Sequence, residues 1–310
     1  MATRASTLPN GRVSATIPNM SPRFTKFEGF GNDYLVFEAN QLAGVGHLGS
    51  FASRICNRHY GAGADGIAIV SESPALAGGH ESESDFGVRI FNPDGSEAGM
   101  SGNGTRCAAS YLFYHDLWSN ELLRLQTRNG IKRYHFLERP GKGSFLFRSE
   151  LGQPRFDSSS IPFQTDQPLE RVIDYPLEVG GEILKMTALQ MGNPNCCVFV
   201  DDFEAIDWRR LGPLIENHPQ FPERTNVIFI RVRDRQNIEE RIWERGVGET
   251  ESSGTCSCAA VVASVINGKC DRRIDVHAPG GIIPIEWRDD DEVVLTGSAG
   301  VVYSGEWLMD

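Results

Sequence analysis

Two short stretches of the chain combine serine, glycine and small polar residues in a pattern that can bind an anion. The first is SGNG at residues 101–104, which follows a polar turn and leads into small residues with a helical pattern. The second is SGT at residues 253–255, in the same setting. The first N–H groups of a helix lack partners within it and lie at the positive end of its dipole, so each stretch predicts a carboxylate or phosphate site. Taken alone, either could be a tight turn before a capped helix.

The two stretches belong to a longer internal repeat. Residues 89–92 read RIFN and residues 241–244 read RIWE, and in both copies the Ser-Gly pair begins nine positions after the last letter. Both copies then reach Cys-Ala-Ala, at 107–109 and at 258–260. Matched spacing over this length indicates two related halves, each with an apolar strand, a glycine-rich loop and a helix N-terminus.

Two related halves would place two equivalent loops about a pseudo-twofold axis. A small substrate between them would meet one helix N-terminus and one reactive side chain from each half. Two helix ends suit a carboxylate, and two opposed side chains suit removal of a proton from one face of a carbon and its return to the other. This is the logic of a racemase or epimerase that needs neither a cofactor nor a metal.

Composition narrows the class of protein. The chain has 310 residues, of which 40% are hydrophobic and 23% charged, enough for one or two globular domains. Its net charge of -11, without a basic stripe, argues against nucleic acid as a partner. Apolar runs such as 259–266 are far shorter than the ~20 residues of a membrane helix. We therefore predict a small-molecule enzyme with no nucleic-acid or membrane partner.

The cysteines and the N-terminal segment bear on location. Seven cysteines form neither a disulfide framework nor a zinc spacing, which indicates a reducing cytoplasm. Residues 1–22 lack Asp and Glu and are rich in Ser, Thr, Pro and Arg. We predict a flexible tail there; a transit segment for an organelle such as the plastid is the alternative.

Both halves are dense in strand patterns and contain only one or two helices each, which predicts an α+β fold rather than a doubly wound sheet. Helices are expected at 48–60, 105–114 and 208–217, and hairpin turns at 129–130 and 140–141. The last strand signal, at 301–303, is expected to return to the first half. We place residues 23–150 and 298–310 in the N-terminal half and 151–297 in the C-terminal half.

Polar residues around the two loops would recognise the substrate. Arg245 offers a planar fork for a second carboxylate, and Glu244 would accept a hydrogen bond from an ammonium group. The competing interpretation of this pair is a solvated surface ion pair. Asparagines would supply neutral hydrogen bonds, although each could instead serve an Asx-turn or cap. The asparagines concerned are Asn32, Asn92, Asn103, Asn193 and Asn226.

These residues lie in motifs that resemble those of the diaminopimelate epimerases. The resemblance extends over roughly residues 24–305. The matching motifs are GND at 31–33, FNPDGSE at 91–97, GNGxRC at 102–107, MGNP at 191–194, FPERxN at 221–226 and ERGxGET at 244–250.

The resemblance implies a fold and an activity. Members of that family consist of two similar halves, each a mixed sheet curled like a barrel around a central helix, with the active site in the cleft between them. They interconvert LL- and meso-diaminopimelate, a precursor of lysine and peptidoglycan, without pyridoxal phosphate. Many are homodimers, and Tyr303 falls where the family has a tyrosine at the dimer contact. The implied substrate contacts are Asn32, Asn92, Gly102, Asn103, Asn193, Asn226, Glu244, Arg245, Gly254 and Thr255.

The chain departs from the family at the positions that carry the chemistry. The family has a catalytic cysteine at each position occupied here by Ser101 and Ser253, and a histidine where Asn195 stands. A thiol near a helix N-terminus reaches the thiolate form at neutral pH. A serine hydroxyl is a far weaker acid and needs an adjacent base, and no histidine lies beside either serine in the sequence.

Three hypotheses remain open from the sequence. The chain could be an epimerase altered to hold its substrate without turnover. It could be a natural divergent member that epimerises slowly, or an isomerase or dehydratase acting on another amino acid. It could also be a non-catalytic protein that binds diaminopimelate or a similar zwitterion. Fold-level analogy does not choose among these, but all three keep an amino acid with a second polar head as the ligand.

Overall fold

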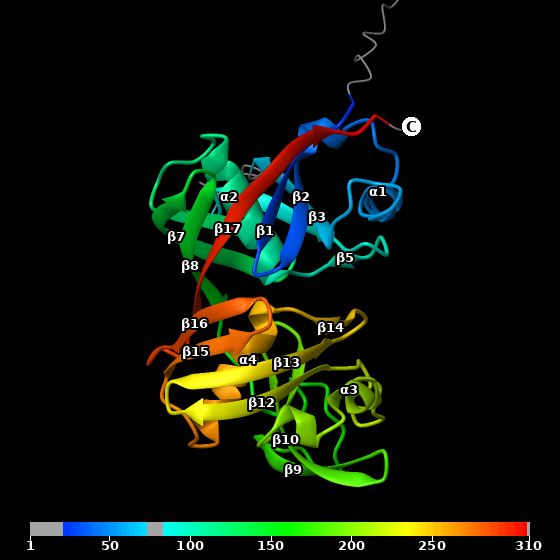
Figure 1. Cartoon of the computed structure of the whole chain (residues 1–310), viewed down its shortest axis with the longest axis vertical. Helices are drawn as coiled ribbons and strands as arrows, with labels where there is room; N and C mark the ends of the chain where they lie inside the picture. Colours follow the sequence, from blue (N-terminus) through cyan, green and yellow to red (C-terminus); the bar gives the residue numbers. More distant parts are fainter. Residues whose placement is uncertain (1–20, 73–82, 309–310) are drawn as a thin grey trace, which may run out of the picture.

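The computed structural model describes residues 21–72 and 83–308, so the predicted N-terminal tail lies almost wholly outside the described residues. Figure 1 shows two bodies stacked along the long axis, with the N-terminal half above and the C-terminal half below. Within the described ranges, no helix has the length and apolar character required to cross a membrane.

The N-terminal half is a barrel. Its strands hydrogen-bond in the closed order β1-β2-β3-β4-β6-β7-β8-β17, parallel at β2–β3 and β4–β6 and antiparallel elsewhere. The elements of this half are β1 (Arg23–Gly29), β2 (Asn32–Glu38), η1 (Ala39–Leu42), α1 (Leu48–Ile55), β3 (Gly66–Glu72), β4 (Phe86–Phe91), β5 (Glu97–Ala98), α2 (Gly102–Tyr114), β6 (Leu122–Thr127), β7 (Gly130–Gly141) and β8 (Ser144–Gly152).

The C-terminal half repeats this plan. From β10 onward it has the same order of elements and the same parallel pairings, now β11–β12 and β13–β15. A bridge between Arg155 and Gln190 links the chain after β8 to β10 and completes the curl. The elements are β9 (Val172–Val179), β10 (Glu182–Gln190), β11 (Pro194–Phe199), η2 (Phe203–Ala205), α3 (Trp208–Glu216), β12 (Asn226–Asp234), β13 (Asn237–Glu244), β14 (Gly248–Thr250), α4 (Gly254–Ile266), β15 (Arg273–Ala278), β16 (Gly281–Trp287) and β17 (Val293–Glu306). The predicted α+β fold with two pseudo-symmetric halves is confirmed.

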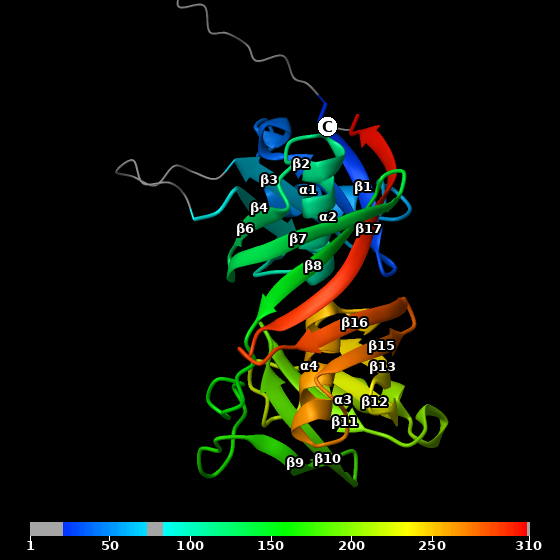
Figure 2. The same cartoon turned by 90° about the vertical axis from the view of Figure 1, so that its left-hand side faces the viewer.

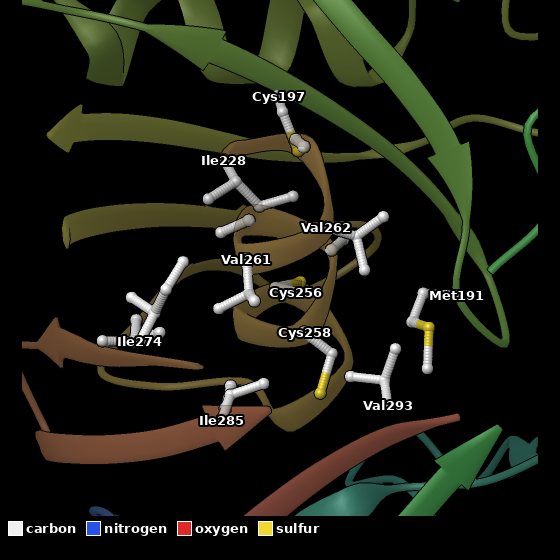
Figure 3. Packing of buried hydrophobic residues seen from close by; sticks show 14 of the residues in the cluster. Met191, Cys197, Ile228, Cys256, Cys258, Val261, Val262, Ile274, Ile285 and Val293 are labelled. Atoms are coloured by element: carbon white, nitrogen blue, oxygen red, sulfur yellow. The ribbon is translucent and has the colours of Figure 1, made fainter. Parts of the chain in front are cut away.

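Each barrel is filled by one helix. All residues of α2 except the last are buried, and α4 is buried from Gly254 to Ser264. α4 is built largely from Ala, Ser, Cys and Val, and α2 combines small residues in its first part with Tyr111, Leu112 and Phe113 near its end. Apolar and small residues on all sides are typical of an enclosed helix. Figure 3 shows Val261 and Cys258 of α4 packed among core side chains that include Ile274 and Ile285.

Two strands join the halves. β17 pairs with β16 at its beginning, with β8 along Val293 to Gly300, and with β1 at its end, and Figure 2 shows it passing from one body to the other. The strand signal at 301–303 is part of the longer strand β17 (Val293–Glu306), which returns to the first half as expected. The predicted domain boundaries at 150/151 and 297/298 fall inside β8 and β17, and the division at those residues stays a prediction.

Other local predictions need correction. α2 begins at Gly102 rather than 105, and α1 ends at Ile55 because residues 57–65 form turns instead of a further helical turn. The second hairpin turns at residues 142–143 rather than 140–141. Strand β9 was not predicted, although Ile173, Tyr175, Leu177 and Val179 alternate with more exposed residues, because Pro176 is disfavoured inside a strand.

Candidate active site

The N-termini of α2 and α4 meet between the two barrels. Ser101 and Ser253 are the N-cap residues and both have extended backbone angles. A methyl group on Gly102 would stand 3.6 Å from the Cα of Gly254, so the first residues of the two helices are in contact. The positive ends of two helix dipoles therefore converge on one place, which favours an anion.

The Ser101 hydroxyl lies among neutral groups. Its oxygen accepts a hydrogen bond from the Gly104 N–H at 3.1 Å and shares a 2.9 Å hydrogen bond with the Tyr34 hydroxyl. Burial raises the pKa of Tyr34 well above its ordinary value. Tyr34 is therefore a neutral hydrogen-bonding group at physiological pH and does not accept a proton from Ser101.

The Ser253 hydroxyl lies beside an acid. It donates to Oε1 of Glu244 at 3.4 Å, a long hydrogen bond. Burial raises the pKa of Glu244 above its ordinary value, while the contact with Ser253 opposes this shift. A carboxylate with a raised pKa is a stronger base, so Ser253 has a proton acceptor within reach.

Thiols near the two helices do not replace the missing cysteines. Cys256 and Cys107 are completely buried. Burial raises the pKa of Cys107 to about 12 and that of Cys256 well above its ordinary value. Both therefore remain protonated and shielded from a substrate.

Two asparagines of the N-terminal half form a fixed chain of hydrogen bonds. Asn103 donates to Oδ1 of Asn32, and Asn32 donates to Oδ2 of Asp65 at 3.3 Å. Asn103 accepts a hydrogen bond from the Arg106 guanidinium. Because each amide has a donor on one side and an acceptor on the other, the orientation of both side chains is determined.

The C-terminal half holds the matching set. Asn226 donates to Oδ1 of Asn195 at 3.1 Å and accepts from the backbone N–H of Arg245 at 2.9 Å. Asn195 is buried and donates to the carbonyl of Asn193 at 2.7 Å. The Arg245 guanidinium donates to the Glu223 carbonyl at 2.9 Å. Hydrogen bonds thus link Asn193, Asn195, Asn226 and Arg245 in one group. Arg245 directly follows Glu244 in the sequence.

Two predicted residues have other surroundings. Asn92 donates to the Ser96 hydroxyl at 3.0 Å, within its own turn. Tyr303 lies on β17 and donates to the Ala62 carbonyl at 3.1 Å, with 41% of its surface exposed. Gly254 and Thr255 are the first two residues of α4, so they lie at the helix end as expected.

Three residues of the site were missed from the sequence. Tyr34 lies in the apolar run of β2, where nothing marks it as different from a core residue. Ser252 accepts from Asn103 and donates to the Phe30 carbonyl, an arrangement between distant segments. Arg106 could have been singled out, since a charged residue within a run of small helical residues is unusual.

Comparison with known proteins agrees with this architecture. Residues 24–154 and 187–302 match the family model described as diaminopimelate epimerase. A diaminopimelate epimerase of Pelotomaculum thermopropionicum is 42% identical over 285 residues, covering 92% of this chain and 98% of that protein. The enzyme of the same name from Moorella thermoacetica is 39% identical over 289 residues, covering 93% and 99%. The solved structure of a predicted epimerase from Pseudomonas aeruginosa superposes with a TM-score of 0.67 at 16% identity, covering 94% and 100%, a likeness of fold alone.

Proposed function

The chain belongs to the diaminopimelate epimerase family, and from this premise we propose that it binds 2,6-diaminopimelate between the N-termini of α2 and α4. The α-proton of one stereocentre then moves between that carbon and the hydroxyls of Ser101 and Ser253. The observation that carries this proposal is the contact of Gly102 with Gly254, which supports one carboxylate being held by two helix ends.

Each polar group of the substrate has a proposed partner in the site. The backbone N–H groups at Gly102, Asn103, Gly254 and Thr255 would hold the α-carboxylate. Glu244 would accept from the α-ammonium group, and Arg245 would pair with the distal carboxylate. The remaining contacts would be neutral hydrogen bonds from Asn32, Asn92, Asn193 and Asn226.

The proton transfer is slow because the reacting groups are hydroxyls. On one side Glu244 takes the Ser253 proton as the Ser253 oxygen takes the α-proton. On the other side Ser101, which is hydrogen-bonded to Tyr34, gives its proton to the opposite face of the carbanion. The Ser101 alkoxide then takes a proton from solvent, and the Glu244 carboxyl group releases one to solvent. In the reverse direction Ser101 must act as the base without a carboxylate beside it. We therefore propose weak epimerisation in which exchange at the Ser253 face is faster.

A single experiment tests binding and turnover together. The protein is incubated with LL-diaminopimelate in D2O, and α-deuterium uptake and the meso isomer are followed while calorimetry measures binding. Uptake above that of the S101A/S253A double variant supports the proposal. Binding without uptake supports a non-catalytic binding protein, which the neutral Tyr34–Ser101 pair would favour. Absence of binding by both the LL and meso isomers overturns the substrate assignment.

We also propose a homodimer formed through the face that carries Tyr303. Val302 beside it is 51% exposed although apolar, which supports a contact surface on this part of β17. Light scattering should give twice the 34.2 kDa mass of one chain, and a V302D variant should give the single mass.

The location of the protein is a separate proposal. All seven cysteines are buried free thiols, which supports a reducing cytoplasm. Fusing residues 1–22 to a fluorescent protein would distinguish this location from the plastid alternative, because a transit segment would direct the fusion to the organelle.

A further inference from the structure

Arg106 is a cation buried beneath the anion site. Its side chain is 1% exposed, and it is the largest of the fully buried side chains in the described part of the protein. It is the fifth residue of α2, one helical turn beyond Asn103. Because arginine keeps its proton at any physiological pH, a full positive charge lies inside the protein near this helix end.

The partners of this guanidinium are neutral. Nε donates to the Ser298 carbonyl at 3.0 Å, Nη2 donates to Oδ1 of Asn103, and the group lies 4.9 Å from the centre of the Phe30 ring. The acidic groups that act on it are Cys107, Tyr134 and Glu28, and among the residues that the structure describes none of them forms an ion pair with it. Burial lowers the pKa of Arg106 from its ordinary value, in agreement with this lack of compensation.

Two effects make this position unfavourable in the empty protein. A buried charge without a counter-ion costs several kcal/mol. A cation near a helix N-terminus also opposes the dipole, which favours anions there. Yet the surroundings fit the group closely, since a methyl group on Gly29 would lie 3.1 Å from Nη2. An anion bound at the same helix end would relieve both effects at once.

We propose that Arg106 is a positioning residue for which the substrate carboxylate is the counter-ion. It acts through its charge at the end of α2 and through Asn103, whose amide it orients toward Asn32. This inference rests on the proposed function, because it requires a carboxylate ligand between the helices. It adds to that function a source of carboxylate affinity that does not touch the substrate.

A purely structural role is the competing explanation. Ser298 lies on β17, so the hydrogen bond from Arg106 also ties α2 to the strand that joins the halves. Loss of affinity in one variant would not separate the two explanations. A lysine at this position does so, since it keeps the charge only while it stays protonated.

The experiment measures diaminopimelate affinity by calorimetry between pH 7 and 9.5 for the parent, R106Q and R106K. R106Q should bind at least about tenfold more weakly, the size expected for one lost charge interaction. R106K should bind nearly as well as the parent at pH 7 and progressively worse as the pH rises, because burial lowers the pKa of a lysine and its charge is then lost. Taking the ratio to the parent at each pH removes the titration of the substrate amines.

Arg272 supplies the matched control. It also donates to backbone carbonyls, those of Trp287 and Arg288, and stacks 4.3 Å from a Trp287 ring centre, but on the outer side of the other half. R272Q should bind like the parent. Equal affinity of R106Q and the parent overturns the role of Arg106 alone, as does a pH-independent ratio for R106K. Absence of binding by the parent overturns the proposed function and this inference with it. If R106Q fails to fold, the pH dependence of the R106K-to-parent affinity ratio distinguishes the two explanations.

Discussion

Helices α2 and α4 have the same structure, but the residues that contact their N-caps have different chemistry. Each has 13 residues, begins at a glycine after a serine N-cap, and lies inside a barrel. At the cap, however, Ser101 shares its hydrogen bond with the hydroxyl of Tyr34, while Ser253 donates to the carboxyl group of Glu244. The twofold repeat therefore extends to the backbone and the cap but not to the proton acceptor.

The difference continues below the caps. Thr105 and Ser257 occupy the same helical position, and each donates to the carbonyl of its own N-cap residue, at 2.7 and 2.9 Å. Beneath Thr105 lies the hydroxyl of Tyr134, whereas beneath Ser257 lies the carboxyl group of Glu240, at 2.6 Å. In both layers, the hydroxyl group of the first half contacts a tyrosine and that of the second half contacts a glutamate, although these partners come from strands that are not equivalent in the repeat. The two helix ends are thus inequivalent toward protons, although each presents the backbone N–H groups of a helix N-terminus.

The largest effect should come from restoring equal chemistry at both caps. In S101C/S253C each helix end gains a thiol whose pKa the helix dipole lowers, so neither side depends on a neighbouring base. We expect epimerisation of diaminopimelate to rise by about 100-fold or more, the range for a well-placed acid–base pair. Each single cysteine variant should give a smaller gain. An unchanged rate in the double variant would show that the missing thiols are not the limiting defect.

Removing the neighbouring groups one at a time tests the asymmetry directly. E244Q deletes the acceptor for the Ser253 proton and should lower α-deuterium uptake by about 100-fold. Y34F deletes only a neutral hydrogen bond and should lower uptake by about threefold, near the value of one such bond. Similar losses in the two variants would contradict the assignment of the base to one side.

The pH dependence of uptake gives a second measurement of the same residue. Glu244 accepts a proton only when ionised, and burial raises its pKa above the ordinary value of 4.5. Uptake should therefore rise with pH through a range above 4.5 and be lost as the pH falls through it. The E244Q variant should lack this rise, and Y34F should retain it.

The parts of the site that the sequence predicted are those encoded locally. A serine before a glycine-rich helix start determines the cap and the dipole without help from the rest of the chain. Matched spacing then placed the two caps together, because a repeat implies a symmetric fold. The start of α2 was missed since Gly102 and Gly104 have low helix propensity, and burial in the barrel outweighs that preference.

The parts that could not be predicted depend on segments far apart in the sequence. Tyr34 reaches Ser101 only because β2 lines the barrel around α2, and a tyrosine in an apolar strand indicates only a core position. The alignment of the two Cys-Ala-Ala sequences is also wrong by one position. Counted from their caps, Cys107 is the sixth residue of α2 and Cys258 the fifth of α4, so the two are not equivalent.

Glu240 should make the stability of the protein depend on pH. Burial raises its pKa from 4.5 to about 7, and its Oε2 lacks a hydrogen-bond partner within the described residues. Between these values the folded state holds a proton that the unfolded state has released, so stability falls as the pH rises from 4.5 to about 7. The loss is on the order of 3 kcal/mol, because each pKa unit corresponds to about 1.4 kcal/mol.

The E240Q variant removes this loss. Its free energy of unfolding in urea should improve relative to the parent as the pH is raised from 5 to 8.5. The control variant is Y134F. Its change in the free energy of unfolding should be constant over that pH range, because burial raises the pKa of Tyr134 to about 12. If the difference in the free energy of unfolding between the parent and E240Q does not change with pH, Glu240 does not titrate in this range.

The smallest effects come from the two hydroxyls that join these layers to the caps. A protonated Glu240 can donate to Ser257, which then donates to the Ser253 carbonyl, just as Tyr134 can donate to Thr105. An ionised Glu240 instead competes with that carbonyl for the single Ser257 proton. T105A should therefore cost about 1 kcal/mol at every pH, the net value of one hydrogen bond, whereas S257A should cost about that amount at pH 5 and more at pH 8.5, where an ionised carboxylate loses its donor.

Ser264 provides the control on the same helix. It is buried and donates to the Ala260 carbonyl at 2.8 Å, the same bond to the preceding turn that Ser257 makes. Its partner is a carbonyl rather than an acid, so S264A should cost a similar amount at both pH values. If S257A and S264A lose unfolding free energy with the same pH dependence, the charge of Glu240 does not affect the N-cap of α4. The inequivalence of the two helix ends toward protons would then be confined to the layer of Tyr34 and Glu244.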